Sequence, residues 1–236
     1  AGRFGADGRR LLLRRPSGFD LHSVREYAQG ESLRRVHWPS TARTGQLMVK
    51  ELEDSPRETV TVLLDCDPAA VAGAPPHWSF DAAVRAAGSI VRYYASEGRK
   101  ATLLTTARDG VVQPVTTVEG DVPTALGMLA GVEPDALFGL APWLRQEQSR
   151  DSHGGELVVV TANLEPAALD AILASATRRL VAVVWVDAAS YVGRPTRSAT
   201  GPLRLSASGI PVAVVRRGED LKSALDFSVP EAQAHG

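Results

Sequence analysis

The chain has 236 residues, of which 44% are apolar and 22% charged, and this composition is that of an ordinary globular protein. Its length suffices for one large α/β domain or for a domain with an attached segment. The single cysteine excludes an internal disulfide, and no run of about 18 apolar residues is present that could form a membrane-spanning helix. No signal peptide opens the sequence, and its first residue is Ala1 rather than Met, so we expect a fragment of a longer protein.

Charge is distributed unevenly along the chain. Although the formal net charge is −1, residues 1–50 contain ten Lys and Arg against four Asp and Glu, whereas the remaining residues contain sixteen against twenty-three. A basic segment joined to an acidic body can attract an acidic partner, lie near an anionic membrane or fold back on its own domain, and we favour the last. Nucleic acid is not an expected partner, because the whole chain is nearly neutral and carries no recognition-helix motif or aromatic-studded basic sheet.

The first part of the chain is predicted to be an arm rather than a domain. Residues 1–17 are rich in Gly and Arg and are predicted to form a linker or a frayed β-arm. Residues 18–56 contain too few apolar side chains to bury a core of their own, so we expect them to pack on the following domain as a brace. Within this arm, residues 46–52 (QLMVKEL) are predicted to be extended and to pair with an edge of the main sheet.

From residue 57 onward, strand and helix patterns alternate. An apolar, β-branched run over residues 59–64 is typical of a buried strand in a parallel sheet. Ser79 is predicted to be the N-cap of a helix over residues 80–96, which ends before Gly98. Further strands are predicted over residues 100–106, 111–117, 156–161, 180–186 and 210–215, and further helical segments over residues 123–130, 135–148, 165–177 and 221–225.

This order of elements predicts the architecture. Strands separated by helices require crossover connections, which give a mostly parallel, doubly wound α/β sheet. Residues 99–117 are the exception, because the turn signal at Asp109–Gly110 predicts one antiparallel hairpin at an edge. We expect a single domain over residues 57–226, followed by a C-terminal tail over residues 227–236.

A specific motif precedes the first buried strand. The polar, Arg-rich residues 19–53 lead into VTVLLDCD (Val60–Asp67), a strand that ends in two aspartates. This arrangement resembles the bacterial family called domain of unknown function 58, whose signature R-x-Y-x-x-G-D-x-x-R-x-I-x-W-x-x-S-A-R precedes a von Willebrand factor A-like domain. The corresponding residues in this chain are Arg25, Tyr27, Gly30, Glu31, Arg34, Val36, Trp38, Thr41, Ala42 and Arg43.

The resemblance covers nearly all of the chain and implies a Rossmann-like fold of the von Willebrand A type. Members of the family usually carry transmembrane helices and a small β-domain upstream. This implies that the full-length protein is membrane-anchored and that the present chain is its cytoplasmic part. Relatives are often encoded beside MoxR-type AAA ATPases, which implies such an ATPase as a protein partner.

In a doubly wound sheet, ligands bind beyond the carboxyl ends of the strands, where the connections diverge to opposite faces. The polar residues expected at that edge are Asp65, Asp67, Thr105, Thr106, Thr161, Asn163 and Asp187. Von Willebrand A domains build a metal-ion-dependent adhesion site there, from D-x-S-x-S, a middle-loop Thr and an Asp after the fourth strand. By this resemblance Asp65 keeps the first position, Asp67 and Ala69 replace the serines, Asn163 replaces the second Asp, and Thr124 is the nearest match to the Thr.

Two interpretations of the acidic residues stay open. Mg²⁺ demands oxygen ligands in octahedral geometry, and two carboxylates within three residues could attract it. Ala69 offers no ligand, so we expect the metal site of Asp65, Asp67 and Asn163 to be degenerate. The interpretation that we favour is that both aspartates accept hydrogen bonds from backbone amides of their own turn. We expect no cofactor other than, at most, this Mg²⁺ ion.

The signature residues also have two interpretations. In the one that we favour, they brace the domain, with the aromatic side chains buried and the guanidinium groups bonded to backbone carbonyls. In the other they form a partner-binding surface, because Trp, Tyr and Arg dominate binding hot spots. The residues concerned are Arg25, Tyr27, Arg34, Arg35, Trp38 and Arg43.

Familiar catalytic motifs are absent from the sequence. It contains no phosphate-binding loop, dinucleotide-binding motif, H-E-x-x-H, C-x-x-C or nucleophile elbow. The five histidines are scattered, and the charges of the aspartates on either side of Cys66 are expected to raise the pKa of its thiol. We therefore expect a non-catalytic protein-interaction module, an adaptor or partner of a MoxR-type AAA ATPase, and not an enzyme. The alternative is a divalent-metal-dependent hydrolase that uses the acidic strand-end site.

Overall fold

The computed structural model describes residues 23–26, 38–51, 59–148, 155–196 and 200–225. The chain divides into two compact units. The smaller unit is Arg14–Ser55, and the larger consists of Ala1–Leu13 together with Pro56–Gly236. Within the described residues, no helix is both long enough and apolar enough to cross a membrane.

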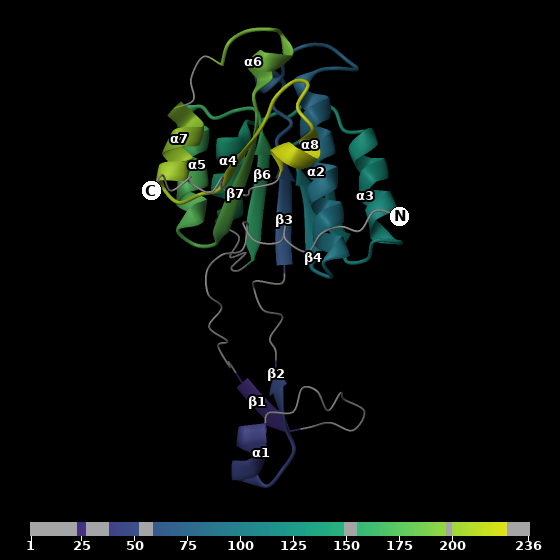
Figure 1. Ribbon diagram of the computed structural model, residues 1–236, viewed down its shortest axis with the longest axis vertical. Helices are drawn as coiled ribbons and strands as arrows, with labels where there is room; N and C mark the ends of the chain where they lie inside the picture. The colour runs from purple at the N-terminus through teal and green to yellow at the C-terminus, as the bar shows by residue number, and fades with distance from the viewer. Residues whose placement is uncertain (1–22, 27–37, 52–58, 149–154, 197–199, 226–236) are drawn as a thin grey trace, which may run out of the picture. The chain divides into compact units, whose positions relative to one another are not determined.

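A six-stranded sheet in the order β5-β4-β3-β6-β7-β8 forms the centre of the larger unit (Figure 1). All neighbouring strands are parallel except β5, which pairs antiparallel with β4. The strands are β3 (Thr59–Leu64), β4 (Lys100–Thr105), β5 (Val112–Val115), β6 (Glu156–Thr161), β7 (Leu180–Val186) and β8 (Val212–Val215). The predicted α/β class, the mostly parallel sheet and the antiparallel edge hairpin are confirmed.

Helices cover both faces of this sheet, as a doubly wound fold requires (Figure 1). Helices α2, α3 and α8 pack on one face, and α4, α5 and α7 pack on the other. The helices are α2 (Ser79–Ser96), α3 (Asp121–Ala130), α4 (Leu140–Gln148), α5 (Pro166–Ala176), α6 (Ala188–Tyr191), α7 (Thr200–Ala207) and α8 (Leu221–Ala224), and a 3₁₀ turn spans Pro68–Ala70.

The central strands are buried on both faces, which explains their continuous apolar sequences. Every residue of β6 is buried, and β7 is buried from Val181 onward. On β3, Val62 and Leu64 pack with α2 and α3, whereas Leu63 between them packs with α4 and α5. Because successive side chains of a strand point to opposite faces, one apolar strand contributes to both layers of the core.

Helix α2 buries the apolar face that its sequence predicts, from Ala82 to Tyr94. The prediction that Ser79 is its N-cap is wrong, because Trp78 occupies that position and provides no side-chain cap. Ser79 is the first helical residue instead, and its hydroxyl accepts a hydrogen bond from the Ala72 amide at 2.9 Å. The side chain therefore holds the preceding loop rather than the first helical turn.

The described residues of the smaller unit form a two-stranded antiparallel sheet and one short helix. Strand β1 (Ser23–Glu26) pairs with β2 (Met48–Glu51), with Ser23 opposite Glu51 and Glu26 opposite Met48. Helix α1 (Trp38–Thr44) precedes β2, and Pro39 lies in its first turn, where a missing amide proton costs nothing. The Thr41 hydroxyl accepts a hydrogen bond from the Met48 amide at 3.0 Å, which joins the helix to the strand.

The prediction that residues 46–52 pair with an edge of the main sheet is wrong. Their extended part, β2, pairs with β1, because a second extended segment lies within the same unit and satisfies its backbone groups. Of the signature residues, Arg43 is exposed in the last turn of α1. Tyr27, Arg34 and Arg35, and the side chains of Arg25 and Trp38, lie outside the described residues. The brace interpretation stays a prediction.

Two helices in the larger unit have no counterpart in the sequence-based prediction. Helix α6 has only four residues, and α7 contains Gly201 and Pro202, which are turn signals in a sequence. Gly201 has a packing reason, because a Cβ atom there would lie 3.0 Å from the Cβ of Leu164. The glycine therefore allows α7 to approach the loop that follows β6.

A buried carboxylate joins α2 to the amino end of β6. Glu156 is 4% exposed, and its Oε1 accepts a hydrogen bond of 2.8 Å from the Tyr94 hydroxyl. Its Oε2 forms an ion pair of 3.0 Å with Arg99, and the Arg99 guanidinium also lies 4.7 Å from the centre of the Tyr94 ring. Burial and the adjacent carboxylate raise the pKa of the Tyr94 hydroxyl, so it donates as a neutral group. The three side chains form one satisfied polar cluster inside the core.

We expect Arg99→Ala to lower the free energy of unfolding by about 3 kcal/mol, because it leaves the buried Glu156 carboxylate without its cation. Tyr94→Phe should cost about 1 kcal/mol, since it removes one hydrogen bond and keeps the ring. Urea denaturation of the two variants and of the unaltered chain measures both differences.

The matched control is Arg85→Ala, which breaks the exposed ion pair of Arg85 with Asp81 on the same helix. Such a pair contributes less than about 0.5 kcal/mol. If Arg99→Ala were no more destabilising than Arg85→Ala, Glu156 would not depend on this ion pair.

Candidate functional site

The carboxyl ends of the three central strands meet at the buried carboxylate of Asp65. Asp65 directly follows β3 and is 5% exposed. Its Oδ2 accepts a hydrogen bond of 2.6 Å from Thr161, the last residue of β6. Its Oδ1 accepts hydrogen bonds from the amide of Asp67 at 3.2 Å and from the hydroxyl of Thr106, after β4, at 3.4 Å. Each oxygen of Asp65 thus accepts at least one hydrogen bond from the protein itself.

Asp67 continues the same network toward the surface. Its Oδ1 accepts a hydrogen bond of 2.9 Å from the Ala69 amide and so caps the 3₁₀ turn. Its Oδ2 accepts a hydrogen bond of 3.1 Å from Nδ2 of Asn163. The Asn163 orientation is fixed, because its Oδ1 accepts from the Glu165 amide at 2.9 Å. Asn163 therefore presents a hydrogen-bond donor, and not an oxygen ligand, to Asp67.

The structure brings together most of the polar residues expected at this edge. Asp65, Asp67, Thr106, Thr161 and Asn163 form one hydrogen-bonded group, which we call the strand-end cluster. Two expected residues lie outside it. Thr105 accepts a hydrogen bond from the Val111 amide within the β4–β5 hairpin, and Asp187 belongs to a separate group of ion pairs described below.

The threonine chosen from the family pattern does not belong to this group. Thr124 lies in α3 and donates to the carbonyl of Gly120 in its own helix, at 3.4 Å. The hydroxyls that contact Asp65 come from Thr106 and Thr161 instead, because β4 and β6 are the strands on either side of β3.

Burial makes the charge on Asp65 unfavourable. Desolvation raises the pKa of the Asp65 carboxyl from 3.8 to about 6, with a smaller increase from the charge of Asp67, while the Thr161 hydroxyl opposes the shift. Asp65 therefore changes its charge at a pH well above that of an ordinary aspartate.

Cys66 is buried and its thiol is a poor nucleophile, as the sequence predicts. The main cause of its raised pKa, however, differs from the expected one. Desolvation is the largest contribution that raises the pKa of its thiol to about 12, and the charge of Asp65 is the second. Of the two flanking aspartates only Asp65 contributes, with a smaller contribution from Asp135, so the expected repulsion is not the dominant effect on the thiol pKa. A thiol of this kind carries almost no thiolate at neutral pH.

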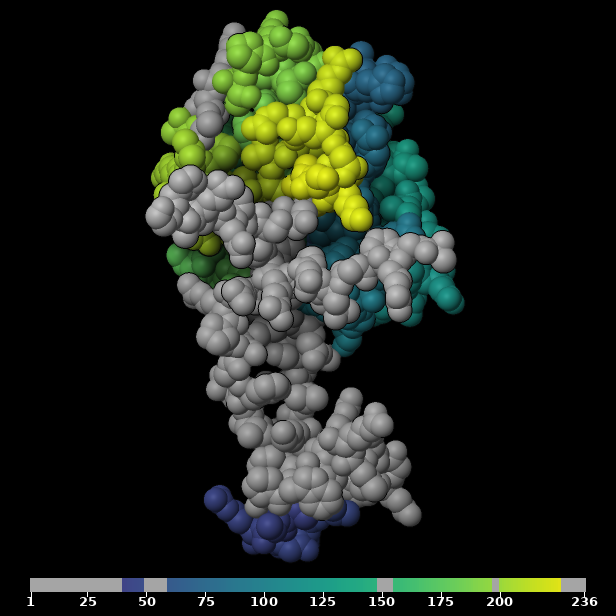
Figure 2. All heavy atoms as spheres, viewed as in Figure 1, coloured from purple at the N-terminus to yellow at the C-terminus, as the bar shows by residue number. Residues whose placement is uncertain are grey.

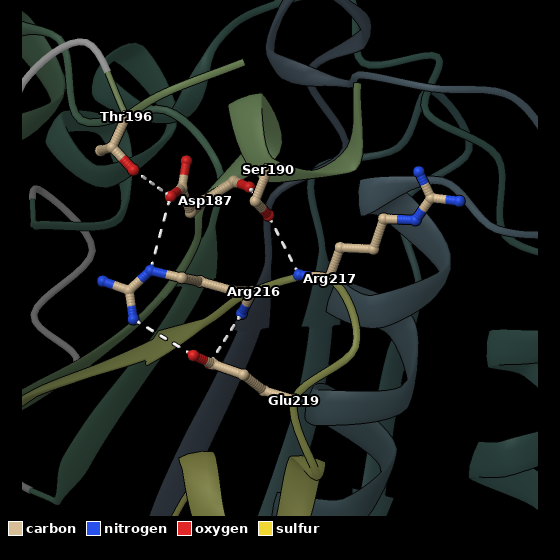
Figure 3. Close-up of polar contacts among 6 residues, drawn as sticks. All are labelled: Asp187, Ser190, Thr196, Arg216, Arg217 and Glu219. Atoms are coloured by element: carbon tan, nitrogen blue, oxygen red, sulfur yellow. Dashed lines mark hydrogen bonds and ion pairs between the residues drawn. The ribbon is translucent and has the colours of Figure 1, made fainter. Parts of the chain in front are cut away.

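Asp187, at the end of β7, forms a separate group of ion pairs with residues after β8 (Figure 3). Its Oδ2 lies 3.7 Å from Nε of Arg216 and also accepts a hydrogen bond from Thr196. The Arg216 guanidinium lies 3.3 Å from Oε1 of Glu219, so it bridges two carboxylates. These contacts join the ends of β7 and β8 and compensate the charge of the buried Asp187.

A surface depression of about 530 Å³ lies beside this group, lined by residues of α2, α6 and the segment after β8. On the face shown in Figure 2, that segment (yellow) is exposed between α6 (green) and α2 (blue). Arg85 and Arg216 line the depression but are paired with carboxylates. Arg217 extends away from the ion pairs (Figure 3), and its Nη1 donates to the Tyr191 carbonyl at 3.3 Å. Two of the three arginines that line the depression are thus paired with carboxylates, and Arg217 is bonded to a carbonyl instead.

The strand-end cluster does not match the donor set of an octahedral Mg²⁺ site. The oxygens of Asp65 and Asp67 already accept hydrogen bonds, the side chain of Ala69 has no ligand atom, and Asn163 directs its amide nitrogen at Asp67. Mg²⁺ requires about six oxygen ligands around it. Among the described residues, no group of three or more His, Cys, Asp or Glu side chains is arranged to hold a metal ion.

Comparisons with known proteins identify a family. The family model described as "Protein of unknown function DUF58" matches residues 23–191, which include β1, the strand-end cluster and α6. A search of curated protein sequences found no match.

Several solved structures are similar to this chain at low sequence identity. A conserved hypothetical protein BatB from Bacteroides thetaiotaomicron is 14% identical, with a TM-score of 0.46, over 70% of this chain and 93% of its own. An aerotolerance-related membrane protein from Bacteroides fragilis is 17% identical, with a TM-score of 0.45, over 70% and 94%. A von Willebrand factor type A protein from Catenulispora acidiphila is 11% identical, with a TM-score of 0.46, over 72% of this chain but 41% of its own.

We expect the free energy of unfolding of the protein to depend on the protonation of Asp65 between pH 4 and pH 7. Because the folded-state pKa is raised from 3.8 to about 6, the folded protein binds the proton more tightly, and this contribution to stability is lost as the pH rises through about 6. The free energy of unfolding of Asp65→Asn, measured relative to that of the unaltered chain, should therefore rise by up to about 3 kcal/mol from pH 4 to pH 7. Urea denaturation at a series of pH values measures the difference.

Thr161→Val is the companion variant, since it removes the O–H group that stabilises the Asp65 carboxylate. It should raise the pKa of Asp65 further, so the loss of stability should occur at a higher pH. A difference between Asp65→Asn and the unaltered chain that stays constant from pH 4 to pH 7 would contradict a buried carboxyl of raised pKa.

Proposed function

Since this chain belongs to the DUF58 family, whose function is unknown, we propose that it is a non-catalytic protein-interaction module. In this proposal, the carboxyl edge of the sheet presents a fixed surface to another protein, and its acidic residues serve structure rather than catalysis or metal binding.

One observation carries the proposal. Each carboxylate oxygen of Asp65 and Asp67 accepts a hydrogen bond from the protein, so the loop after β3 is held by its own contacts. The hydrogen bonds come from the strand ends and turns around the two aspartates, so the carboxylates hold these segments together. A loop held in one conformation is suited to recognition, because little conformational freedom is lost on binding.

The partner that we propose is a MoxR-type AAA ATPase of the same organism, as the family resemblance implies. We also propose that the chain is the cytoplasmic part of a membrane-anchored protein, where such an ATPase would meet it. The basic residues Arg34 and Arg35 of the arm would then attract acidic groups of the ATPase during association. Charges at a rim act mainly on the association rate and on its salt dependence.

We expect the purified full-length protein to bind the MoxR-type ATPase of its own organism in a surface plasmon resonance measurement. The double variant Arg34→Glu/Arg35→Glu should slow association by about tenfold and flatten its dependence on salt concentration, since it reverses the sign of these two charges.

The control is Arg85→Glu/Arg92→Glu, which makes the same change of charge at exposed positions of α2. If this control slowed association as much, the effect would come from net charge and not from the arm. Unfolding of the Arg34/Arg35 variant would assign these arginines to the brace. Metal-dependent turnover of a phosphoester or peptide by the protein would contradict the interaction module and support the hydrolase alternative.

A further inference from the structure

Two large apolar side chains are exposed next to the strand-end cluster. Leu137 is 62% exposed and Phe138 is 72% exposed, which makes Phe138 the most exposed large apolar residue in the described part of the chain. Single exposed apolar residues are common on protein surfaces. Two consecutive ones of this size leave an apolar area in water that would release free energy if a partner covered it.

The backbone of this loop is held in place on both sides. The Ala136 amide donates to the carbonyl of Cys66 at 3.1 Å, and Oδ1 of Asp135 accepts from the Arg108 amide at 3.0 Å. After the loop, Leu140 is buried in the core as the first residue of α4. The exposed side chains are thus displayed by an anchored loop.

The loop also lies directly against the strand-end cluster. A Cβ atom added at Gly139 would be 3.7 Å from Oδ2 of Asp67, the oxygen that is bonded to Asn163. Leu137 and Phe138 directly precede Gly139, and we call these two residues together with the surface side of the cluster the strand-end patch.

Several carboxylates belong to this loop or to the segments that contact the loop or the cluster. Asp109, Glu133 and Glu165 are exposed, and Asp67 and Asp135 are partly exposed, whereas Arg108 is the cation that adjoins them. Among the described residues, no cation forms an ion pair with Asp109, Glu133 or Glu165. The patch thus combines exposed apolar side chains with an excess of carboxylates.

We propose that the strand-end patch docks a partner protein through a pocket that is apolar at its centre and rimmed by Lys and Arg side chains. Phe138 and Leu137 fill the pocket, and the carboxylates meet the basic rim. This inference rests on the proposed interaction function and specifies its surface and the chemistry of the partner. The charge of the patch disfavours the other candidates, because anionic membranes and nucleic acids would repel its carboxylates.

Photo-cross-linking in the native host tests this docking surface. Phe138 is replaced by p-benzoylphenylalanine in the full-length protein, and Leu203, which is 66% exposed on α7, is the matched control position. We expect irradiation to give one protein adduct of defined size from position 138 and none from position 203. Adding Asp109→Lys/Glu133→Lys should lower the adduct yield by about tenfold, and Asp109→Asn/Glu133→Gln should lower it less.

Several outcomes would overturn the inference: no adduct from position 138, an adduct with lipid or nucleic acid, an adduct of the size of two copies of this chain, or a yield that charge reversal does not change. The proposed partner is tested separately by the identity of the adduct. A charge-sensitive adduct with a protein other than a MoxR-type ATPase would support the patch and contradict the ATPase. Binding of the ATPase without an adduct from position 138 would contradict the patch and leave the interaction module standing.

Discussion

The carboxylate of Asp65 accepts hydrogen bonds from groups at the ends of three neighbouring strands: its own β3 turn, Thr106 after β4 and Thr161 of β6. These contacts fix the carboxyl edge of the sheet where the chain must leave it in different directions. The position of Asp67 follows from them, because its amide is one of the donors. Asp67 in turn holds the 3₁₀ turn and Asn163, and Gly139 lies against it. The conformation of the strand-end patch therefore depends on one buried carboxylate.

The central strands were predictable from the sequence, because strands that are buried on both faces of a sheet have continuous apolar sequences. Residues 156–161 and 180–186 are examples in which the predicted and observed strands coincide. Helix α7 was not predictable, because Gly201 and Pro202 are turn signals unless the contact with Leu164 is known. The pairing of β2 with β1 was missed for a similar reason, since an extended segment does not specify its partner.

The candidate site was predictable in its residue types but not in its contacts. Asp65, Asp67, Thr106, Thr161 and Asn163 all follow strands, so their common edge could be inferred from the α/β pattern. Which hydroxyl contacts Asp65 depends on the strand order, and that order places β4 and β6 beside β3 and leaves Thr124 in its own helix. The exposed pair Leu137 and Phe138 left no signal in the sequence, because apolar residues in a loop are as compatible with burial as with exposure.

We propose that hydrogen bonds, and not a metal ion, organise the strand-end cluster. Crystals of the protein grown with millimolar Mn²⁺ test it most directly, since anomalous scattering locates the ion and the coordinates show each ligand. We expect no Mn²⁺ at Asp65 and Asp67, with Thr161 still bonded to Asp65 and the Asn163 amide nitrogen still bonded to Asp67. An anomalous peak beside Asp65 and Asp67 with about six oxygen neighbours near ~2.1 Å would contradict it.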